Sequence, residues 1–461
     1  MVTAQSTRPW RALSFLALAL ALALGACLDK PSAPAGTTDA APMFDMPADA
    51  DLVDASFCPP GATPLPADLL LRRISRIGNY DNDTNDDVFV WGRTQSGQGT
   101  SAAYLVRGRE PMELRCYDRA FAFTGNAVEI LDTWFGDLTR DSSSDLLLFA
   151  RDDGPNNAYL THLYPGLPAG GVAGTPDERA GSKNTFSSPI GSSLFDPYPA
   201  YIAGWTSTEE AGVVFGGINA PYGALVFDSG LNTIQAPMVM QDMATGNGMF
   251  FSSEAVQDMI PYNNTDPHRF LVVTNANVDI MAHVAGTPAT FEKLGGRTAL
   301  SDNLPRFVRA WRHLYGNSEL VAATQASGGF DIITYDGTAP RVRRLQAGSE
   351  LDGRTHEDIA FGNLDGDTSL DLVALVSNNS AAQLIVYRNL VFGTDTITAT
   401  APRSITLPKS HNILAVGDFD GNASTPDTIL ALQTGVNGSL GRCLHFVVAN
   451  ACLAECSATC P

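Results

Sequence analysis

Short apolar runs bounded by Gly, Asn, Asp and Pro recur along most of the chain. In the clearest of them, such as Val88–Trp91 and Leu372–Leu375, neighbouring positions are apolar without alternation. This pattern is typical of strands that are buried on both faces. Helical periodicity is nearly absent, and turn residues separate the runs. The pattern therefore predicts an all-β chain built from many short, buried strands.

Four of these runs follow the same kind of acidic loop, which reveals an internal repeat. In these loops 58 residues separate Asn79 from Asp137, and 55 separate Asn363 from Asp418. The 226 residues between Asp137 and Asn363 equal four such periods, so three degenerate copies are expected there and seven copies in all. The degenerate copies are Tyr201–Trp205 with Val213–Phe215, Phe250–Val256 with Phe270–Val273, and Phe307–Trp311 with Leu320–Ala323.

A third strand-like run follows the second in every copy, and a fourth is expected in copies one to six, for example around 114–117 and 342–345. Repeated antiparallel units of this kind predict a seven-bladed β-propeller, with an array of β-sandwiches as the alternative. Because the chain ends soon after copy seven, we expect residues 56–71 to complete the last blade. The third runs are 103–106, 158–160, 224–227, 280–282, 332–335, 384–387 and 444–448.

The acidic loops carry oxygen-bearing side chains at their first, third, fifth and ninth positions. A short loop that alternates carboxylates in this way can surround a hard cation such as Ca²⁺. The alternative is that these residues only form solvated Asx turns. The candidate ligands are Asn79, Asp81, Asp83 and Asp87 in loop one, Asp137, Thr139, Asp141 and Asp145 in loop two, Asn363, Asp365, Asp367 and Asp371 in loop six, and Asp418, Asp420, Asn422 and, after a one-residue insertion, Asp427 in loop seven.

The sequences Gly-Asn-Leu-Asp-Gly-Asp of loop six and Gly-Asp-Phe-Asp-Gly-Asn of loop seven resemble the FG-GAP repeat, the integrin α-type and VCBS-like family. The resemblance implies a seven-bladed propeller with calcium between the first and second strands of several blades. Copies three to five depart from the pattern and are assigned no metal. The predicted propeller covers residues 58–450.

The N-terminus reads as an export signal, with Arg8 and Arg11 before the apolar run 12–23. That run is too short to span a bilayer, which takes about 20 residues. It ends in Leu-Gly-Ala-Cys27, which resembles a bacterial lipobox and implies a signal peptide over 1–26 and lipidation of Cys27; an ordinary cleaved signal is the alternative. Residues 27–57 have the composition of a disordered tether. Leu28 after the cysteine favours the outer membrane or cell surface.

Six cysteines besides Cys27 suggest disulfides in an exported protein, with zinc at 452, 456 and 460 as the alternative. We expect Cys58 to bond a cysteine of the tail, 451–461, and so to close the ring. The net charge of −20 becomes −22 once Arg8 and Arg11 are removed with the signal. A field of that sign disfavours nucleic acid as a partner and favours divalent cations.

Catalytic signatures with a specific spacing are absent from the sequence. His356-Glu357-Asp358 is the most suggestive polar cluster, and its position before a strand favours a turn. The sequence therefore predicts no enzyme, but a lipid-anchored, calcium-binding propeller that serves as an adhesion, ligand-binding or envelope scaffold protein. Its partner is an unknown protein or polysaccharide. The alternative function is a propeller-type polysaccharide lyase or glycoside hydrolase, and this choice rests on analogy of fold.

Overall fold

The structure is a computed structural model that describes residues 58–448 with gaps, the longest at 168–184, 187–200, 243–255 and 433–443. Chain contacts divide the protein into Met1–Asp51 and Leu52–Pro461, and every described residue belongs to the second unit. The predicted signal, Cys27, the tether and the cysteine-rich tail lie outside the described residues. No helix in the described part of the chain is long and apolar enough to cross a membrane.

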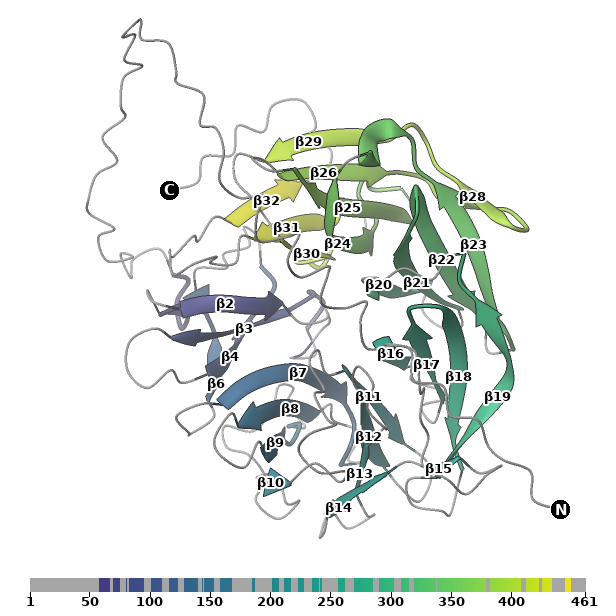
Figure 1. The fold of residues 1–461 in the computed structure, drawn as a ribbon. Coiled ribbons are helices and arrows are strands. Elements are labelled where there is room, and N and C mark those ends of the chain that lie inside the picture. The colour runs from purple at the N-terminus through teal and green to yellow at the C-terminus, as the bar shows by residue number, and fades with distance from the viewer. Residues whose placement is uncertain are drawn as a thin grey trace, which may run out of the picture. The chain divides into compact units, whose positions relative to one another are not determined.

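The described residues form an all-β fold of successive antiparallel sheets (Figure 1). Most sheets take their strands in chain order, as the repeated runs predicted. The first three are β2 (Leu69–Ile74), β3 (Val88–Thr94), β4 (Ser101–Val106) and β6 (Arg119–Ala122); β7 (Val128–Gly136), β8 (Asp145–Asp152), β9 (Ala158–Tyr164) and β10 (Thr185–Phe186); and β11 (Tyr201–Thr206), β12 (Ala211–Gly216), β13 (Gly223–Phe227) and β14 (Ile234–Val239).

Each of the next two sheets is extended by a short strand or hairpin from outside its own four consecutive strands. β15 (Gln241–Asp242) adds in parallel to β19, and the hairpin of β27 (Val391–Phe392) and β28 (Thr396–Thr398) adds in parallel to β23. These additions cover the outer edges of both sheets, which would otherwise offer unpaired backbone groups. The main strands are β16 (Val256–Pro261), β17 (Arg269–Thr274), β18 (Asn277–His283) and β19 (Thr290–Ala299), then β20 (Val308–Leu314), β21 (Glu319–Ala326), β22 (Gly329–Tyr335) and β23 (Pro340–Gln346).

The last two sheets carry the acidic loops with the most complete description. A single 3₁₀ turn, η2 (Ser349–Leu351), precedes them. The strands are β24 (Thr355–Gly362), β25 (Asp371–Ser377), β26 (Ala382–Tyr387) and β29 (Arg403–Leu407), then β30 (Ile413–Gly417), β31 (Thr428–Leu432) and β32 (Leu444–Val448).

The hydrophobic core lies between neighbouring sheets. Leu372, Ala374 and Val376 of β25 pack toward the β20–β23 sheet, whereas Val373 and Leu375 pack toward the β30–β32 sheet. Successive side chains of a strand point to opposite faces, so a strand buried on both faces must be apolar at every position. This arrangement explains the continuous apolar runs of the sequence.

From β7 through β11, β16, β20 and β24 to β30, the first strand of each sheet contacts the first strand of the next. The first sheet contacts β7 through β3 and β4, and β30 contacts β2. Figure 1 shows the sheets arranged around a common centre. Radial packing of antiparallel sheets around such a centre is the β-propeller architecture. The predicted all-β propeller fold is thus confirmed.

The predicted number of seven blades is wrong for the described residues. The described residues form five complete blades, each a sheet of four or more strands whose packing against its neighbours is described. These sheets contain β3, β8, β17, β21 and β25. The burial of the β11–β14 sheet is largely outside the description, and the β30–β32 sheet has only three strands. Strand additions and shortened edges make the repeats unequal.

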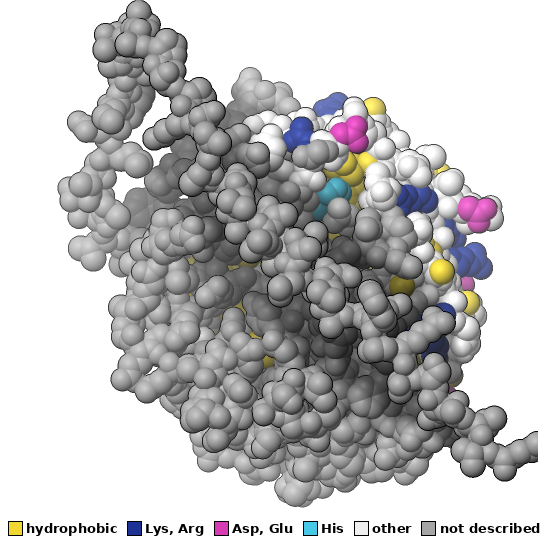
Figure 2. All heavy atoms as spheres, in the orientation of Figure 1, with side chains coloured by type: hydrophobic (Ala, Val, Ile, Leu, Met, Phe, Trp, Pro, Cys, Tyr) yellow, Lys and Arg dark blue, Asp and Glu magenta, His cyan; other side chains and the backbone are white. Residues whose placement is uncertain are grey.

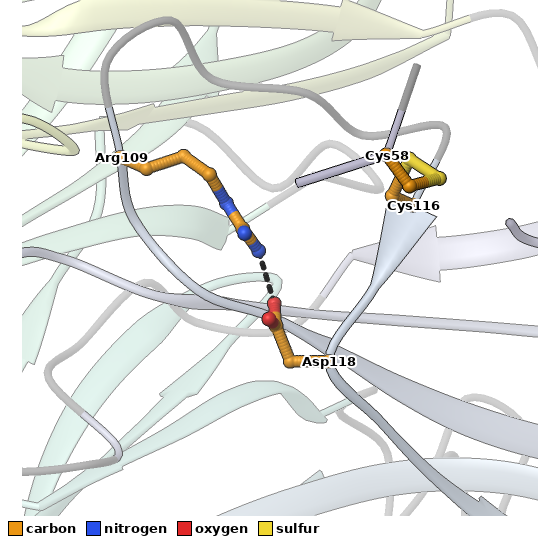
Figure 3. The surroundings of a disulfide bond; sticks show 4 residues. All are labelled: Cys58, Arg109, Cys116 and Asp118. Atoms are coloured by element: carbon orange, nitrogen blue, oxygen red, sulfur yellow. Dashed lines mark hydrogen bonds and ion pairs between the residues drawn. A yellow bond between two sulfur atoms is a disulfide. The ribbon is translucent and has the colours of Figure 1, made fainter. Parts of the chain in front are cut away.

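The predicted closure by residues 56–71 is wrong. β1 (Thr63–Pro64) pairs with β5 (Cys116–Tyr117), and β2 (Leu69–Ile74) is the first strand of the first sheet. Cys58 forms a disulfide with Cys116 and not with a cysteine of the tail (Figure 3). The Cα atoms of the two cysteines are 5.7 Å apart. Residues 116–117, where the fourth strand was expected, form β5 and pair with β1. The fourth strand of the first sheet is β6, which pairs with β4. The other fourth strand, expected at 342–345, lies in β23 as predicted.

Candidate functional site

The ninth residue of three acidic loops is a fully buried aspartate with a structural task. Asp87, Asp145 and Asp371 each have an exposed fraction of 0%. The Oδ2 atom of each accepts an N–H from the loop before its strand: from Tyr80 at 2.8 Å, from Leu138 at 2.7 Å and from Leu364 at 2.6 Å. Buried carboxylates need such partners to offset the loss of hydration.

The other carboxylate oxygen of the same three residues reaches a second loop. Oδ1 accepts the N–H of Gly108 at 2.8 Å, of Gly166 at 2.6 Å and of Asn389 at 2.8 Å, all in the connection after the third strand. Each aspartate therefore ties together two loops at the same end of its sheet. Asn389 has φ of 57°, a left-handed conformation that Asn tolerates better than most residues. We call these three residues the staple aspartates.

Burial raises the pKa of Asp371 to about 6. The hydrogen bonds from Asn389 and Leu364 act in the opposite direction, and the nearby charges of Asp365 and Asp367 add to the rise. Ionised Asp371 is therefore electrostatically unfavourable at this buried position, and the N–H groups of Leu364 and Asn389 hold its carboxylate in place.

In loop seven the structure corrects the alignment of the ninth position. Strand pairing places Gly417 opposite Thr428, in the way that Gly362 is opposite Asp371 and Gly136 is opposite Asp145. Asp427 is therefore equivalent to the eighth position. The predicted one-residue insertion is in fact two residues long, and the staple position is occupied by Thr428.

The remaining described loop residues form short-range turns. Asp83 Oδ1 accepts the N–H of Asn85 at 2.6 Å, and Asp367 Oδ1 accepts that of Ser369 at 2.6 Å. Asp420 Oδ1 accepts the N–H of Asn422 at 2.9 Å. A carboxylate that accepts the N–H two residues ahead is an Asx turn.

The described residues cover the predicted calcium sites only in part. No group of three or more His, Cys, Asp or Glu side chains within the described ranges converges to hold a metal ion. Among the predicted ligands, Asn79, Asp81 and Asp141 lie outside the described residues, whereas Asp137 and Thr139 lie in loop two, where the Thr139 N–H also donates to Asp145. Calcium binding stays a prediction from the sequence.

Loops six, seven and one lie against each other and form an acidic face. Asn363 of loop six and Asp427 of loop seven exchange hydrogen bonds, as do Asp418 of loop seven and Asp86 of loop one. The described carboxylates that are exposed or half-buried on this face are Asp83, Asp86, Asp365, Asp367, Asp418 and Asp420, and Asp427 is buried beside them. Arg388 and Asp365 form an ion pair of 3.4 Å.

Two carboxylates of loop seven have pKa values shifted in opposite directions. Burial raises the pKa of Asp418 to about 6, and a hydrogen bond with Asp420 and the charges of Asp420 and Asp427 add to the rise. Burial would also raise the pKa of Asp420, but the Asn422 N–H, Asp418 and the Thr425 hydroxyl donate to it and hold its pKa below the usual value. Below about pH 6 this pair therefore holds one proton, mainly on Asp418.

Basic side chains gather elsewhere. On β19 and β23 they pair with buried aspartates: Lys293 and Arg297 with Asp279, and Arg344 with Asp331. Figure 2 shows Lys and Arg side chains on the side of the molecule where Figure 1 places these outer strands. These ion pairs therefore join the third and fourth strands of two sheets and do not involve the acidic loops.

Sequence reasoning missed a second set of buried aspartates on the first strands. Asp132, Asp258 and Asp358 each follow a register shift in strand pairing, and the Asp358 Oδ2 atom accepts the N–H of Leu414 in the next sheet at 3.0 Å. His356-Glu357-Asp358 is therefore part of β24 and not a turn before a strand. A bulge in the first strand has no clear signature in a single sequence, which is why these residues were missed.

No family model and no curated protein matches the sequence. Solved structures of similar fold include a putative 6-phosphogluconolactonase from Bacteroides uniformis, which is 12% identical over 82% of this chain and 100% of that chain, with a TM-score of 0.41. The NanB sialidase (K499G mutant) from Streptococcus pneumoniae is 10% identical over 82% and 67% of the two chains, with a TM-score of 0.41. The WD40 domain of SCAP from fission yeast is 10% identical over 83% and 81%, with a TM-score of 0.38.

These similarities concern the fold alone. The prediction that the protein is not an enzyme is nevertheless contradicted, because solved structures of similar fold include a sialidase and a putative lactonase. Membership of the FG-GAP family is not shown by any of the matches.

Proposed function

We propose that this protein is a carbohydrate-directed enzyme, a glycoside hydrolase, that works on the acidic loop face. The observation that carries the proposal is the Asp418–Asp420 pair, whose pKa values are moved apart by their surroundings. Two neighbouring carboxyl groups with separated pKa values are the usual basis for assigning a proton donor and an ionised partner.

Asp418 is suited to act as the general acid. With its pKa raised to about 6, a substantial fraction of this carboxyl carries a proton at mildly acidic pH. As the glycosidic bond breaks, Asp418 gives its proton to the leaving oxygen and ionised Asp420 stabilises the positive charge that develops on the sugar ring. A water molecule then adds to the anomeric carbon and returns a proton to Asp418. Glycoside hydrolysis passes through an oxocarbenium-like transition state, which nearby carboxylates favour.

The charge of the face also indicates the substrate class. The exposed and half-buried carboxylates of this face repel polyanions, so polysaccharides of uronic acids, the usual substrates of lyases, are poor ligands. Neutral and amino-sugar polysaccharides are not repelled, and a protonated amino sugar is attracted. These charges favour the hydrolase over the lyase.

Residues 1–57 add a location to the proposal. Export and lipidation at Cys27, as predicted from the sequence, would hold the acidic face close to envelope or external polysaccharide. The partner of the protein is then a glycan and not a nucleic acid.

The test is a turnover assay of the full-length protein on neutral, amino-sugar and uronic polysaccharides. We expect release of reducing ends from one of the first two classes, lost by at least about 100-fold in Asp418→Asn, since general acid catalysis contributes about 10²–10⁴-fold. Asp352→Asn is the matched control, because Asp352 is exposed and lies in the turn after η2. Binding without turnover would show a lectin-like module, and turnover of uronic substrates alone would show a lyase.

A further inference from the structure

The seam between the last and the first sheets joins segments from opposite ends of the domain. β30 contacts β2, and Ile413, Ala415 and Leu430 of the last sheet share an apolar core with Val88 and Val90 of the first. In the described part of the chain, no N-terminal strand completes the three-stranded last sheet, because β1 pairs with β5. Apolar contact alone does not fix the register of two sheets, so a more directional contact is expected at this seam.

A reciprocal pair of hydrogen bonds crosses the seam. The N–H of Asp86 donates to the carbonyl oxygen of Asp418 at 2.7 Å, and the N–H of Asp418 donates to Oδ2 of Asp86 at 2.9 Å. The two residues are 332 positions apart in the chain. Two bonds in opposite directions between the same residues fix both the distance and the register of the loops.

The same geometry recurs at the other seam of the last sheet. The N–H of Asp427 donates to the carbonyl oxygen of Asn363 at 2.7 Å, and the N–H of Asn363 donates to Oδ2 of Asp427 at 2.8 Å. Asp86 and Asp427 both occupy the eighth position of their loops. In loop six this position is Leu370, which packs in the core shared with the β20–β23 sheet. An aspartate at the eighth loop position thus occurs on both sides of the β30–β32 sheet, which has three described strands.

Close packing of the loops supports the contact. A Cβ atom at Gly421 of loop seven would overlap Oδ1 of Asn85, and a Cβ atom at Gly108 would come within 2.9 Å of the carbonyl oxygen of Phe419. Asn85 Nδ2 in turn donates to the carbonyl oxygen of Gly108 at 2.9 Å. The backbone of loop one therefore lies directly on loop seven beside the Asp86–Asp418 pair.

We infer that Asp86 is the latch that closes the ring, that Asp427 is the equivalent latch on the other side of the last sheet, and that the seam between β2 and β30 is where the ring opens when the latch is lost. The latch partner Asp418 is also the proposed general acid, but the latch itself uses the Asp86 side chain and backbone groups, so hydrogen exchange tests it without reference to activity.

The test is hydrogen–deuterium exchange of the full-length protein with Asp86→Ala and Asp427→Ala. Loss of the carboxylate acceptor leaves a half-buried N–H without that partner, so we expect exchange to rise about tenfold or more in the elements beside the lost latch. Asp86→Ala should affect β30, β31 and β3 and leave β16–β19 unchanged, whereas Asp427→Ala should affect β24 and β30 and leave β3 unchanged. Asp395→Ala, an exposed turn residue, is the control.

A uniform rise around the whole ring in both variants, or unchanged exchange in β30 and β31, would overturn the inference. If Asp86→Ala fails to fold, Asp86→Asn supplies the test, since it keeps one acceptor oxygen and loses the charge. It should show a smaller rise confined to the same elements, and a rise elsewhere would count against the latch.

Discussion

The staple aspartates allow a quantitative test of what holds the acidic loops together. Asp371 is fully buried and accepts the N–H groups of Leu364 and Asn389 at 2.6 and 2.8 Å. In Asp371→Ala both N–H groups lose their acceptor, and an unsatisfied buried donor costs about 1–3 kcal/mol. Removing a costly buried charge offsets part of this. We therefore expect the free energy of unfolding to fall by about 2–4 kcal/mol.

The assay is urea unfolding followed by fluorescence, with Asp395→Ala as the matched control. Asp395 is exposed in the turn between β27 and β28, so its replacement should change the free energy of unfolding by no more than about 0.5 kcal/mol. If Asp371→Ala is destabilised by less than about 1 kcal/mol, the two backbone bonds do not stabilise the loop and the reasoning is refuted.

The pH dependence of the same variant gives a second result. The folded-state pKa of Asp371, about 6, lies above the unfolded value of about 3.9. The folded protein therefore binds this proton more tightly, and the stability that the protonated group contributes is present below about pH 4 and is lost as pH rises to about 6. In Asp371→Ala this decline should disappear, so the gap in unfolding free energy between wild type and variant should narrow from pH 4 to pH 6. A gap that widens over this range would contradict the raised pKa.

Three further predictions follow from the loops and the disulfide. Gly421→Ala should lower the unfolding free energy by more than about 1 kcal/mol, because Gly421 has φ of 68° and a Cβ atom would overlap Asn85; urea unfolding tests this, and a neutral effect would refute the close packing. Reduction of the Cys58–Cys116 disulfide, which closes a segment of 58 residues, should cost about 2–4 kcal/mol in the same assay, and peptide mapping that pairs Cys58 with another cysteine would contradict the assignment. The sequence-based metal sites predict a saturable rise in the melting temperature from EDTA to millimolar calcium, and an unchanged melting temperature would show that the loop carboxylates serve only as hydrogen-bond acceptors in turns.

The sequence alone determined the all-β class, the repeat and most strand positions. The runs at Val88–Trp91 and Leu372–Leu375 are apolar at every position because each face packs against a neighbouring sheet, and that requirement is local enough to read from the chain. The acidic loops were also visible in sequence, because Gly, Asp and Asn at fixed offsets are needed for the turn itself.

The tertiary structure alone decided how the loops are used and how the ring closes. Whether a loop aspartate points toward a cation, its own turn or the next sheet depends on groups that lie far away in sequence, such as Asn389 for Asp371 and Asp418 for Asp86. The pairing of Cys58 with Cys116 likewise depends on the β1–β5 contact. A residue pattern records which groups need a partner, but only the folded chain brings the partners within hydrogen-bonding distance.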